Sequence, residues 1–200
     1  MSRQATSFVL GYHGCDSNTA EKLISGATSV RQSKQPYDWL GPGSYFWESD
    51  PLRAKEWADW RVEQGHYKDA AVIGGIIELG NCLDLAQRRN IKLVKGAYLS
   101  FSKQRQTAGL PMPENKSVKG QPNQDRILRF LDCAVFQHLH SSMEEAAEAG
   151  SSIPPFDTVR GVFTEGEPLY EGCGFFEKTH AQIAVLNPEN IIGIFRPKRL

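Results

Sequence analysis

The stretch at 39–58, WLGPGSYFWESDPLRAKEWA, restricts the fold more than any other part of the chain. The Gly-Pro-Gly at 41–43 predicts a tight turn at which the backbone can approach a ligand, because glycine has no Cβ. A short aromatic strand follows, and the Asp-Pro at 50–51 is typical of a helix cap and a first helical residue. Turn, strand and helix together predict an aromatic-walled cleft, with Tyr45 on the strand and Trp57 on the helix. The alternative interpretation is that both rings belong to the core.

The composition and the cysteine pattern predict a cytoplasmic globular protein of one domain. The chain has 200 residues, with 23 Lys plus Arg and 23 Asp plus Glu, which argues against a protein that coats nucleic acid but leaves local patches open. We find no segment typical of a signal peptide or a membrane span, so we expect no membrane partner. The cysteines lie far apart without metal-ligand spacing, which predicts free thiols and no zinc site; they are Cys15, Cys82, Cys133 and Cys173.

Strand-like segments near both ends of the chain and helical segments between them predict an α+β fold. The patterns predict strands at 7–12, 44–47, 70–79, 159–164, 180–186 and 191–195, and longer helices at 84–104 and 125–148. The first strand leads directly into the His-Gly at 13–14, and Asp16 or Ser17 can cap the helix that follows. The helix at 125–148 is predicted to be the longest, with Asp125 as its cap.

A long segment at 103–124, rich in proline, glycine and polar residues, is predicted to be a loop. Loops of this length in a compact domain are usually functional or disordered. Positive side chains recur along it and just beyond it, namely Lys103, Arg105, Lys116, Lys119 and Arg126. We interpret the segment as a loop that binds an acceptor, and the alternative is a solvated loop without a partner.

Four short segments, taken in order along the chain, point to one known fold. They are YHG at 12–14, GPGSYF at 41–46, AKEWA at 54–58 and HAQIAVL at 180–186. Together they resemble the ADP-ribosyltransferase fold, in particular its diphtheria-toxin and poly(ADP-ribose) polymerase branch. The resemblance implies split antiparallel sheets with flanking helices, in a single catalytic domain over 1–200. Residues 80–155 have no counterpart in it and are interpreted as a family-specific insertion of helices and loops.

The resemblance also implies that NAD is the substrate, and it assigns roles to individual residues. His13 resembles the histidine that holds a ribose hydroxyl of NAD, and Gly14 would bond the nicotinamide carboxamide through its backbone. Tyr45 would stack on the nicotinamide ring, with Trp57 near the position of the second stacking aromatic. Such a clamp positions the leaving group, and polar groups at the ribose stabilise the oxocarbenium-like charge that develops as the glycosidic bond breaks.

The branch that this chain resembles carries a His-Tyr-Glu triad, and here the glutamate position is occupied by Gln182. An amide can hydrogen-bond a ribose hydroxyl but is no general base, so elongation of poly(ADP-ribose) is not expected. His180, two residues earlier, is predicted to share the strand face of Gln182. The preceding loop offers carboxylates that could activate the acceptor, with Glu177 as the candidate; the alternative is that all of them are solvated, namely Glu165, Glu167, Glu171 and Glu177.

The resulting hypothesis is an NAD-dependent mono-ADP-ribosyltransferase with a protein or nucleic acid as acceptor. Its candidate catalytic residues are His13, Tyr45, Gln182 and Glu177. By analogy of fold alone, it suggests a toxin or defence effector, with a neutralising antitoxin as a partner. Two alternatives stay open: a non-catalytic module that binds NAD or ADP-ribose, which Gln182 favours, and an NAD glycohydrolase that uses water as acceptor.

Overall fold

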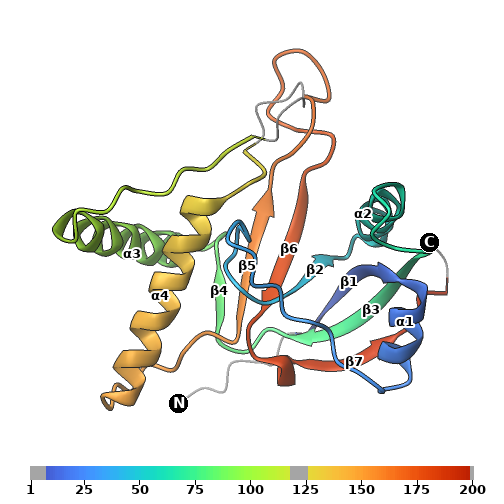
Figure 1. Ribbon diagram of the computed structural model, residues 1–200, viewed down its shortest axis with the longest axis horizontal. Helices are drawn as coiled ribbons and strands as arrows, with labels where there is room; N and C mark the ends of the chain where they lie inside the picture. The colour runs from blue at the N-terminus through green and yellow to red at the C-terminus, as the bar shows by residue number, and fades with distance from the viewer. Residues whose placement is uncertain (1–7, 118–125, 199–200) are drawn as a thin grey trace.

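The computed structural model describes residues 8–117 and 126–198 and shows a mixed α+β architecture (Figure 1). Its strands are β1 (Phe8–Asp16), β2 (Ser44–Glu48), β3 (Ala70–Glu78), β4 (Cys82–Asp84), β5 (Thr158–Phe163), β6 (His180–Val185) and β7 (Ile191–Phe195). Its helices are α1 (Ser17–Ile24), α2 (Pro51–Glu63), α3 (Arg88–Thr107) and α4 (Phe130–Glu148), with the 3-10 turn η1 (Pro188–Asn190). The predicted α+β class is therefore confirmed.

The strands of the described residues form one sheet in the order β4-β5-β6-β2-β1-β3-β7. Neighbouring strands run antiparallel except β4 and β5, which are parallel. The structure thus differs from the expected split antiparallel sheets, because all the described strands belong to one hydrogen-bonded sheet and because β4 and β5 are parallel. The two halves of the sheet are joined between β1 and β2 only at Gly11↔Glu48 and Tyr12↔Trp47.

Helix α1 covers one face of the sheet, and α2 and α4 cover the other. Successive residues of a strand point to opposite faces. Phe46 of β2 accordingly packs with α1, whereas Trp47 packs with α2. In β6, Ile183 joins the α1 side of the core and Ala184 joins the cluster formed with α4. Helix α3 packs alongside α4, at the β4 end of the sheet (Figure 1), and no helix in the described residues is both long and apolar enough to cross a bilayer.

The predicted central turn and the helix after it are confirmed. Gly41 and Gly43 have φ angles of 81° and 155°, in the region that favours glycine. Asp50 caps α2 by accepting a 3.0 Å hydrogen bond from the backbone N–H of Arg53, and Pro51 is the first helical residue. The residue before a helix and its first turn are local features, so the sequence alone suffices to place them.

The first strand is longer than predicted. β1 continues past Tyr12 to Asp16, because β3 pairs with it along its whole length. His13 and Gly14 consequently lie inside the strand and not at its exit. Asp16 still caps α1, since its side chain accepts a 3.1 Å hydrogen bond from the backbone N–H of Asn18.

The two long helices also differ from the prediction. α3 continues into the segment predicted as a loop and has 20 residues, against 19 for α4, so α4 is not the longest helix. α4 begins at Phe130, because a backbone pair between Lys116 and Leu128 keeps the residues before it extended. Asp125 and Lys119, predicted as a helix cap and a loop cation, lie outside the described residues.

Candidate functional site

The candidate site begins where β1 and β2 separate. Beyond Tyr12↔Trp47 the two strands no longer pair with each other, although β1 still pairs with β3 and β2 with β6. His13 is the first β1 residue after this point. Its ring bridges the opening, since His13 Nδ1 lies 2.9 Å from the backbone carbonyl oxygen of Tyr45. The two motifs quoted around residues 13 and 45 therefore meet at the opening between the halves of the sheet.

This contact fixes the chemical state of the His13 ring. A carbonyl oxygen only accepts hydrogen bonds, so the proton of the pair lies on Nδ1. Burial lowers the pKa of His13, and the bond to the Tyr45 carbonyl raises it by less. The ring is therefore neutral at pH 7, with the proton on Nδ1 and a lone pair on Nε2. Such a ring can accept a hydrogen bond from a ligand hydroxyl.

Gly14 lies against α2 and is required there by packing. A Cβ at Gly14 would lie 2.2 Å from the carbonyl oxygen of Ala54 and 3.1 Å from the Cβ of Ala58. Any larger residue would push α2 away from the sheet. The glycine thus has a structural explanation that needs no ligand, beside the expected role of its backbone in holding a carboxamide.

Tyr45 is tied to the turn that precedes its own strand. Its hydroxyl donates a 2.7 Å hydrogen bond to the carbonyl oxygen of Gly41 and accepts a 3.0 Å bond from the N–H of Leu40. Burial is the main reason why the pKa of Tyr45 is raised well above its ordinary value. The phenol is therefore a neutral, fixed group, suited to forming a wall and not to moving protons.

Trp57 belongs to an aromatic cluster on the α2 face, and the cluster includes a residue that the sequence reasoning missed. Trp47 of β2 lies between Trp57 and His180, with ring centroids 5.9 and 6.3 Å away. Its side chain is 7% exposed, and its indole N–H is buried without a hydrogen-bond partner among the described residues. Strand alternation could have singled it out, because it lies two residues after Tyr45 on the same face.

Gln182 is buried on the same face, directly beside Trp47 in the neighbouring strand. Its Oε1 accepts a 2.6 Å hydrogen bond from the indole N–H of Trp39. The amide is therefore held in one orientation, which leaves its NH₂ group as the end available to other partners. No carboxylate of the described residues contacts it, so the position carries no charge.

His180 shares the face of Gln182, as predicted. Its ring stacks on Phe163 with a centroid distance of 5.7 Å, and its Nδ1 lies 2.6 Å from the carbonyl oxygen of Lys178. Burial is the main cause of its lowered pKa. Like His13, it is a neutral ring with the proton on Nδ1 and an accepting Nε2.

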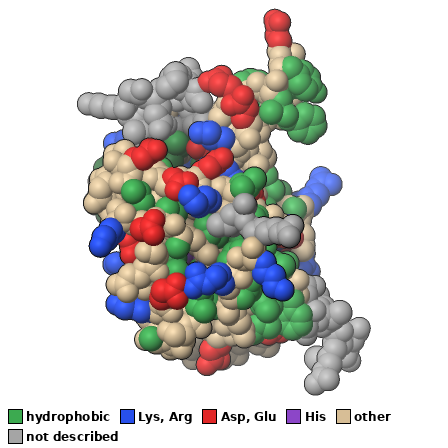
Figure 2. Space-filling view, turned by 90° about the vertical axis from the view of Figure 1, so that its right-hand side faces the viewer, with side chains coloured by type: hydrophobic (Ala, Val, Ile, Leu, Met, Phe, Trp, Pro, Cys, Tyr) green, Lys and Arg blue, Asp and Glu red, His purple; other side chains and the backbone are tan. Residues whose placement is uncertain are grey.

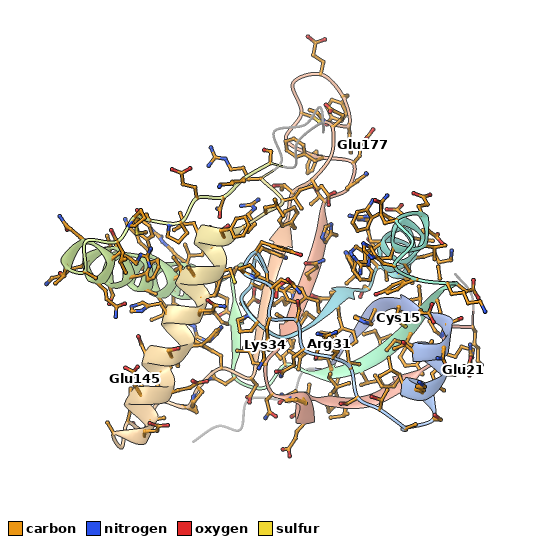
Figure 3. All side chains as sticks on the ribbon, in the orientation of Figure 1. Cys15, Glu21, Arg31, Lys34, Glu145 and Glu177 are labelled. Atoms are coloured by element: carbon orange, nitrogen blue, oxygen red, sulfur yellow. The ribbon has the colours of Figure 1, made fainter. Side chains whose placement is uncertain are left out.

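The loop at 165–179 forms a hairpin that projects beyond the sheet, closed by a bridge between Pro168 and Phe176 (Figure 1). Glu165, at its base, is anchored to α2 by a 2.9 Å ion pair with Arg53. The other three glutamates of the loop are exposed, and Glu177 lies on the projecting part, away from the strands (Figure 3). The structure thus places Glu177 apart from Gln182. Figure 2 shows apolar side chains on this projection, where Leu169, Tyr170 and Phe175 are exposed.

The predicted site residues form two groups at the opening of the sheet. The His13 ring faces the α1 side, 5.7 Å from that of Phe46, and it meets the backbone carbonyl oxygen of Tyr45 and not the side chain of Tyr45. The side chains of Tyr45 and Gln182 and the aromatic cluster of Trp57 lie on the opposite face, and no hydrogen bond between side chains of the described residues joins them to His13. A ligand that contacts both groups would have to enter the opening itself.

No cofactor or metal can be assigned from other parts of the described chain. It contains no group of three His, Cys, Asp or Glu residues arranged to hold a metal ion. Two open surface cavities, of about 470 and 420 Å³, lie along α3 and not at the opening of the sheet.

Comparison with known proteins gave no relative of this chain. No protein-family model, no curated protein and no solved structure matches it.

Proposed function

We propose that the protein is an NAD-dependent mono-ADP-ribosyltransferase whose site is the opening between β1 and β2. The observation that carries the proposal is the 2.9 Å bond from His13 Nδ1 to the Tyr45 carbonyl. It links the His-Gly and Gly-x-Gly-x-Tyr motifs across the opening and leaves Nε2 as an acceptor. A ribose hydroxyl of NAD is a donor of the matching kind.

The reaction would proceed by departure of nicotinamide. The leaving group takes the electron pair of the glycosidic bond, and positive charge develops on the ribose. An acceptor nucleophile then forms the new bond at the same carbon and releases its proton to solvent. Because Gln182 is neutral, the transition state would be stabilised by hydrogen bonds and by the pyrophosphate of NAD, and not by a carboxylate at this position.

The buried indole N–H of Trp47 supports the proposal that a ligand binds on the α2 face of the sheet, beside Gln182. A buried donor without a partner costs about 1–3 kcal/mol, which an acceptor atom of a ligand would recover. The neighbouring rings of Trp57 and His180 make the surroundings of this donor suitable for a flat heteroaromatic group.

A second candidate function is binding of NAD or ADP-ribose without chemistry. The observation in its favour is the bond between Gln182 and Trp39, which uses the side-chain oxygen of Gln182 inside the protein. A buried, uncharged and internally bonded residue at this position is compatible with recognition alone.

Incubation with NAD labelled in both the nicotinamide and the adenylate parts separates the candidates. We expect a transferase to release nicotinamide and to place the adenylate label on a macromolecule from cell extract. Release of both labels as small molecules would indicate a glycohydrolase, and binding without release would indicate a recognition module.

A matched pair of variants on α2 ties the reaction to the site. Trp57→Ala removes a ring of the cluster, whereas Trp60→Ala removes a ring that is 48% exposed on the same helix. Nicotinamide release should fall in the first variant and persist in the second, provided that both retain the thermal unfolding transition of the wild type. Equal release by both folded variants would contradict the proposed site.

A further inference from the structure

Positive charge is concentrated on α3. This helix holds six of the 23 Lys and Arg residues and none of the 23 Asp and Glu residues, so the rest of the chain has a net charge of −6. By contrast, Figure 2 shows blue and red side chains intermingled on the face of the molecule at the α1 and α2 end. The protein has no net charge, but α3 alone carries a charge of +6 and therefore produces a strong local positive potential.

Four of the six cations of α3 lie in a stripe on the side of the helix that faces away from the protein. Asn90, Val94, Ala97 and Phe101 are the residues that turn inward, the last three towards the cluster formed with α4. At 3.6 residues per turn the opposite side of the helix carries Arg88, Lys92, Lys95, Leu99 and Lys103. All five are exposed. We call these five residues the α3 stripe.

Ion pairs within the described part of the chain do not account for this charge. No carboxylate in the described residues forms an ion pair with a cation of the α3 stripe. Arg88 and Arg89 moreover occupy the first turn of α3, where the helix dipole is already positive, and Gln87 provides no side-chain cap. Cations at that end destabilise the helix by themselves, and a bound anion would reverse the sign of this contribution.

We propose that the α3 stripe binds the phosphodiester backbone of a nucleic acid. Four exposed cations on one side of a helix, without ion pairs in the described residues, match a chain of phosphates. Tyr98, which is 40% exposed beside the stripe, offers a ring for base stacking. An anionic membrane is a poorer fit, because an interfacial helix needs a broad exposed apolar face. The main apolar face of α3 is packed against α4, and the exposed side chains of Ile91, Leu93 and Leu99 lie on different sides of the helix, among the cations.

The positive surface continues towards the candidate site. From the end of α3, residues 108–117 return towards the top of β5 and β6 (Figure 1), and the side chains of Lys116 and Arg126, on either side of the residues outside the description, are exposed. Arg129, which forms a 3.2 Å ion pair with Asp132, then places its guanidinium 4.9 Å from the ring centroid of Phe163, which stacks on His180. A bound strand could follow this path to the site. Binding by α3 is independent of the proposed chemistry, and only the consequence that this strand is the acceptor rests on the proposed function.

The test compares two triple variants with the same change in charge. The stripe variant carries Lys92→Gln, Lys95→Gln and Lys103→Gln. The control variant carries Lys22→Gln, Lys68→Gln and Lys198→Gln, at exposed positions on α1, before β3 and after β7. Fluorescence anisotropy measures the affinity of each for short labelled single-stranded RNA, single-stranded DNA and duplex DNA over a series of salt concentrations. Co-sedimentation with phosphatidylserine vesicles is measured in parallel.

We expect wild type and control to bind at least one of the three nucleic acids, and the stripe variant to bind it at least tenfold more weakly. The slope of log affinity against log salt should fall by about 2–3 in the stripe variant, since each lost phosphate contact contributes about 0.7–0.9. The three probes identify the form of nucleic acid. Equal affinity of stripe and control variants, binding of vesicles alone, or no binding of nucleic acid at low salt would overturn the proposal.

The acceptor is examined separately with NAD labelled in its adenylate part. If the label enters the bound oligonucleotide in wild type and falls in the stripe variant, the strand is the acceptor. If the oligonucleotide binds but a protein takes up the label, the binding stands and the acceptor is a protein. Absence of nicotinamide release with normal oligonucleotide binding contradicts only the proposed function.

Discussion

At the scale of single residues, Gln182 decides what chemistry the site can support. Its oxygen is held by Trp39, so its NH₂ group is the part that can meet a ribose hydroxyl. This arrangement favours a positioning role over proton transfer. A glutamate in the same place could accept the same bond from Trp39 and would add a charge.

Substitution of Gln182 should separate these roles. We expect Gln182→Ala to lower kcat by roughly 10²–10³, the loss typical of one well-placed group at a developing charge. Gln182→Glu should retain activity or shift it towards NAD hydrolysis, and its pH profile should gain an acidic limb that the wild type lacks. Steady-state rates across pH measure both effects. Wild-type rates in Gln182→Ala would show that this residue does not contact the reacting group.

A second prediction at this scale concerns His140 and the pH dependence of the free energy of unfolding. It is buried on α4 against the turn at Gly41, and burial lowers its pKa to about 4, below the ordinary 6.5. Between these pH values the unfolded chain binds more protons than the folded one, so stability is full above pH 6.5 and falls as the pH drops. The shift corresponds to about 3 kcal/mol lost by pH 4.

Urea unfolding at pH 7 and pH 4 should therefore show a smaller loss of stability in His140→Leu than in wild type. Carboxylates titrate in both proteins, so the difference between their losses of unfolding free energy from pH 7 to pH 4 isolates the contribution of His140. Parallel loss in the two proteins would mean that the ring becomes protonated without unfolding, and hence that water reaches it.

At the scale of elements, the packing of α2 on β1 depends on Gly14. The carbonyl oxygen of Ala54 occupies the place of a Cβ, so Gly14→Ala should destabilise the fold by about 1–3 kcal/mol. Gly96→Ala is the matched control, because the same methyl group on α3 meets no atom within 4 Å and should stabilise the helix by about 0.5–1 kcal/mol. Denaturant midpoints measure both. An unchanged midpoint for Gly14→Ala would mean that α2 moves freely.

The elements that local sequence determines were predicted well, and those that depend on distant partners were not. The Asp-Pro cap fixed the start of α2, and the β-branched run at 191–195 gave β7 with its observed bounds. The end of β1 depends on pairing with β3, and the start of α4 depends on the bridge between Lys116 and Leu128. No local pattern contains these pairings, so single-sequence reasoning ended β1 too early and began α4 too soon.

The same division applies to the candidate site. The motifs around His13 and Tyr45 were found from the sequence, but the hydrogen bond that joins them forms only when β1 and β2 separate. The unpaired indole N–H of Trp47 likewise depends on surroundings supplied by α2 and β6. The sequence shows which residues are present, whereas a buried donor without a hydrogen-bond partner can be recognised only in the folded structure.

At the scale of the whole molecule, the sheet consists of two halves that meet at β1 and β2. One half carries α1 and α2, and the other carries α4 with α3 beside it (Figure 1). His13 stands at the junction, and the α3 stripe lies at the far end of the second half. This separation predicts that NAD binding and nucleic-acid binding can be lost independently by mutation.

The most direct test of the central claim is the affinity for NAD, measured by calorimetry, of His13→Asn beside His66→Asn. The first variant removes the accepting Nε2 at the opening of the sheet, and the second makes the same change at an exposed histidine after α2. We predict that His13→Asn binds NAD at least tenfold more weakly, a loss of about 1.4 kcal/mol, while His66→Asn binds as wild type does. Equal affinity of the two folded variants, or no binding of NAD by the wild type, would contradict a site for NAD between β1 and β2.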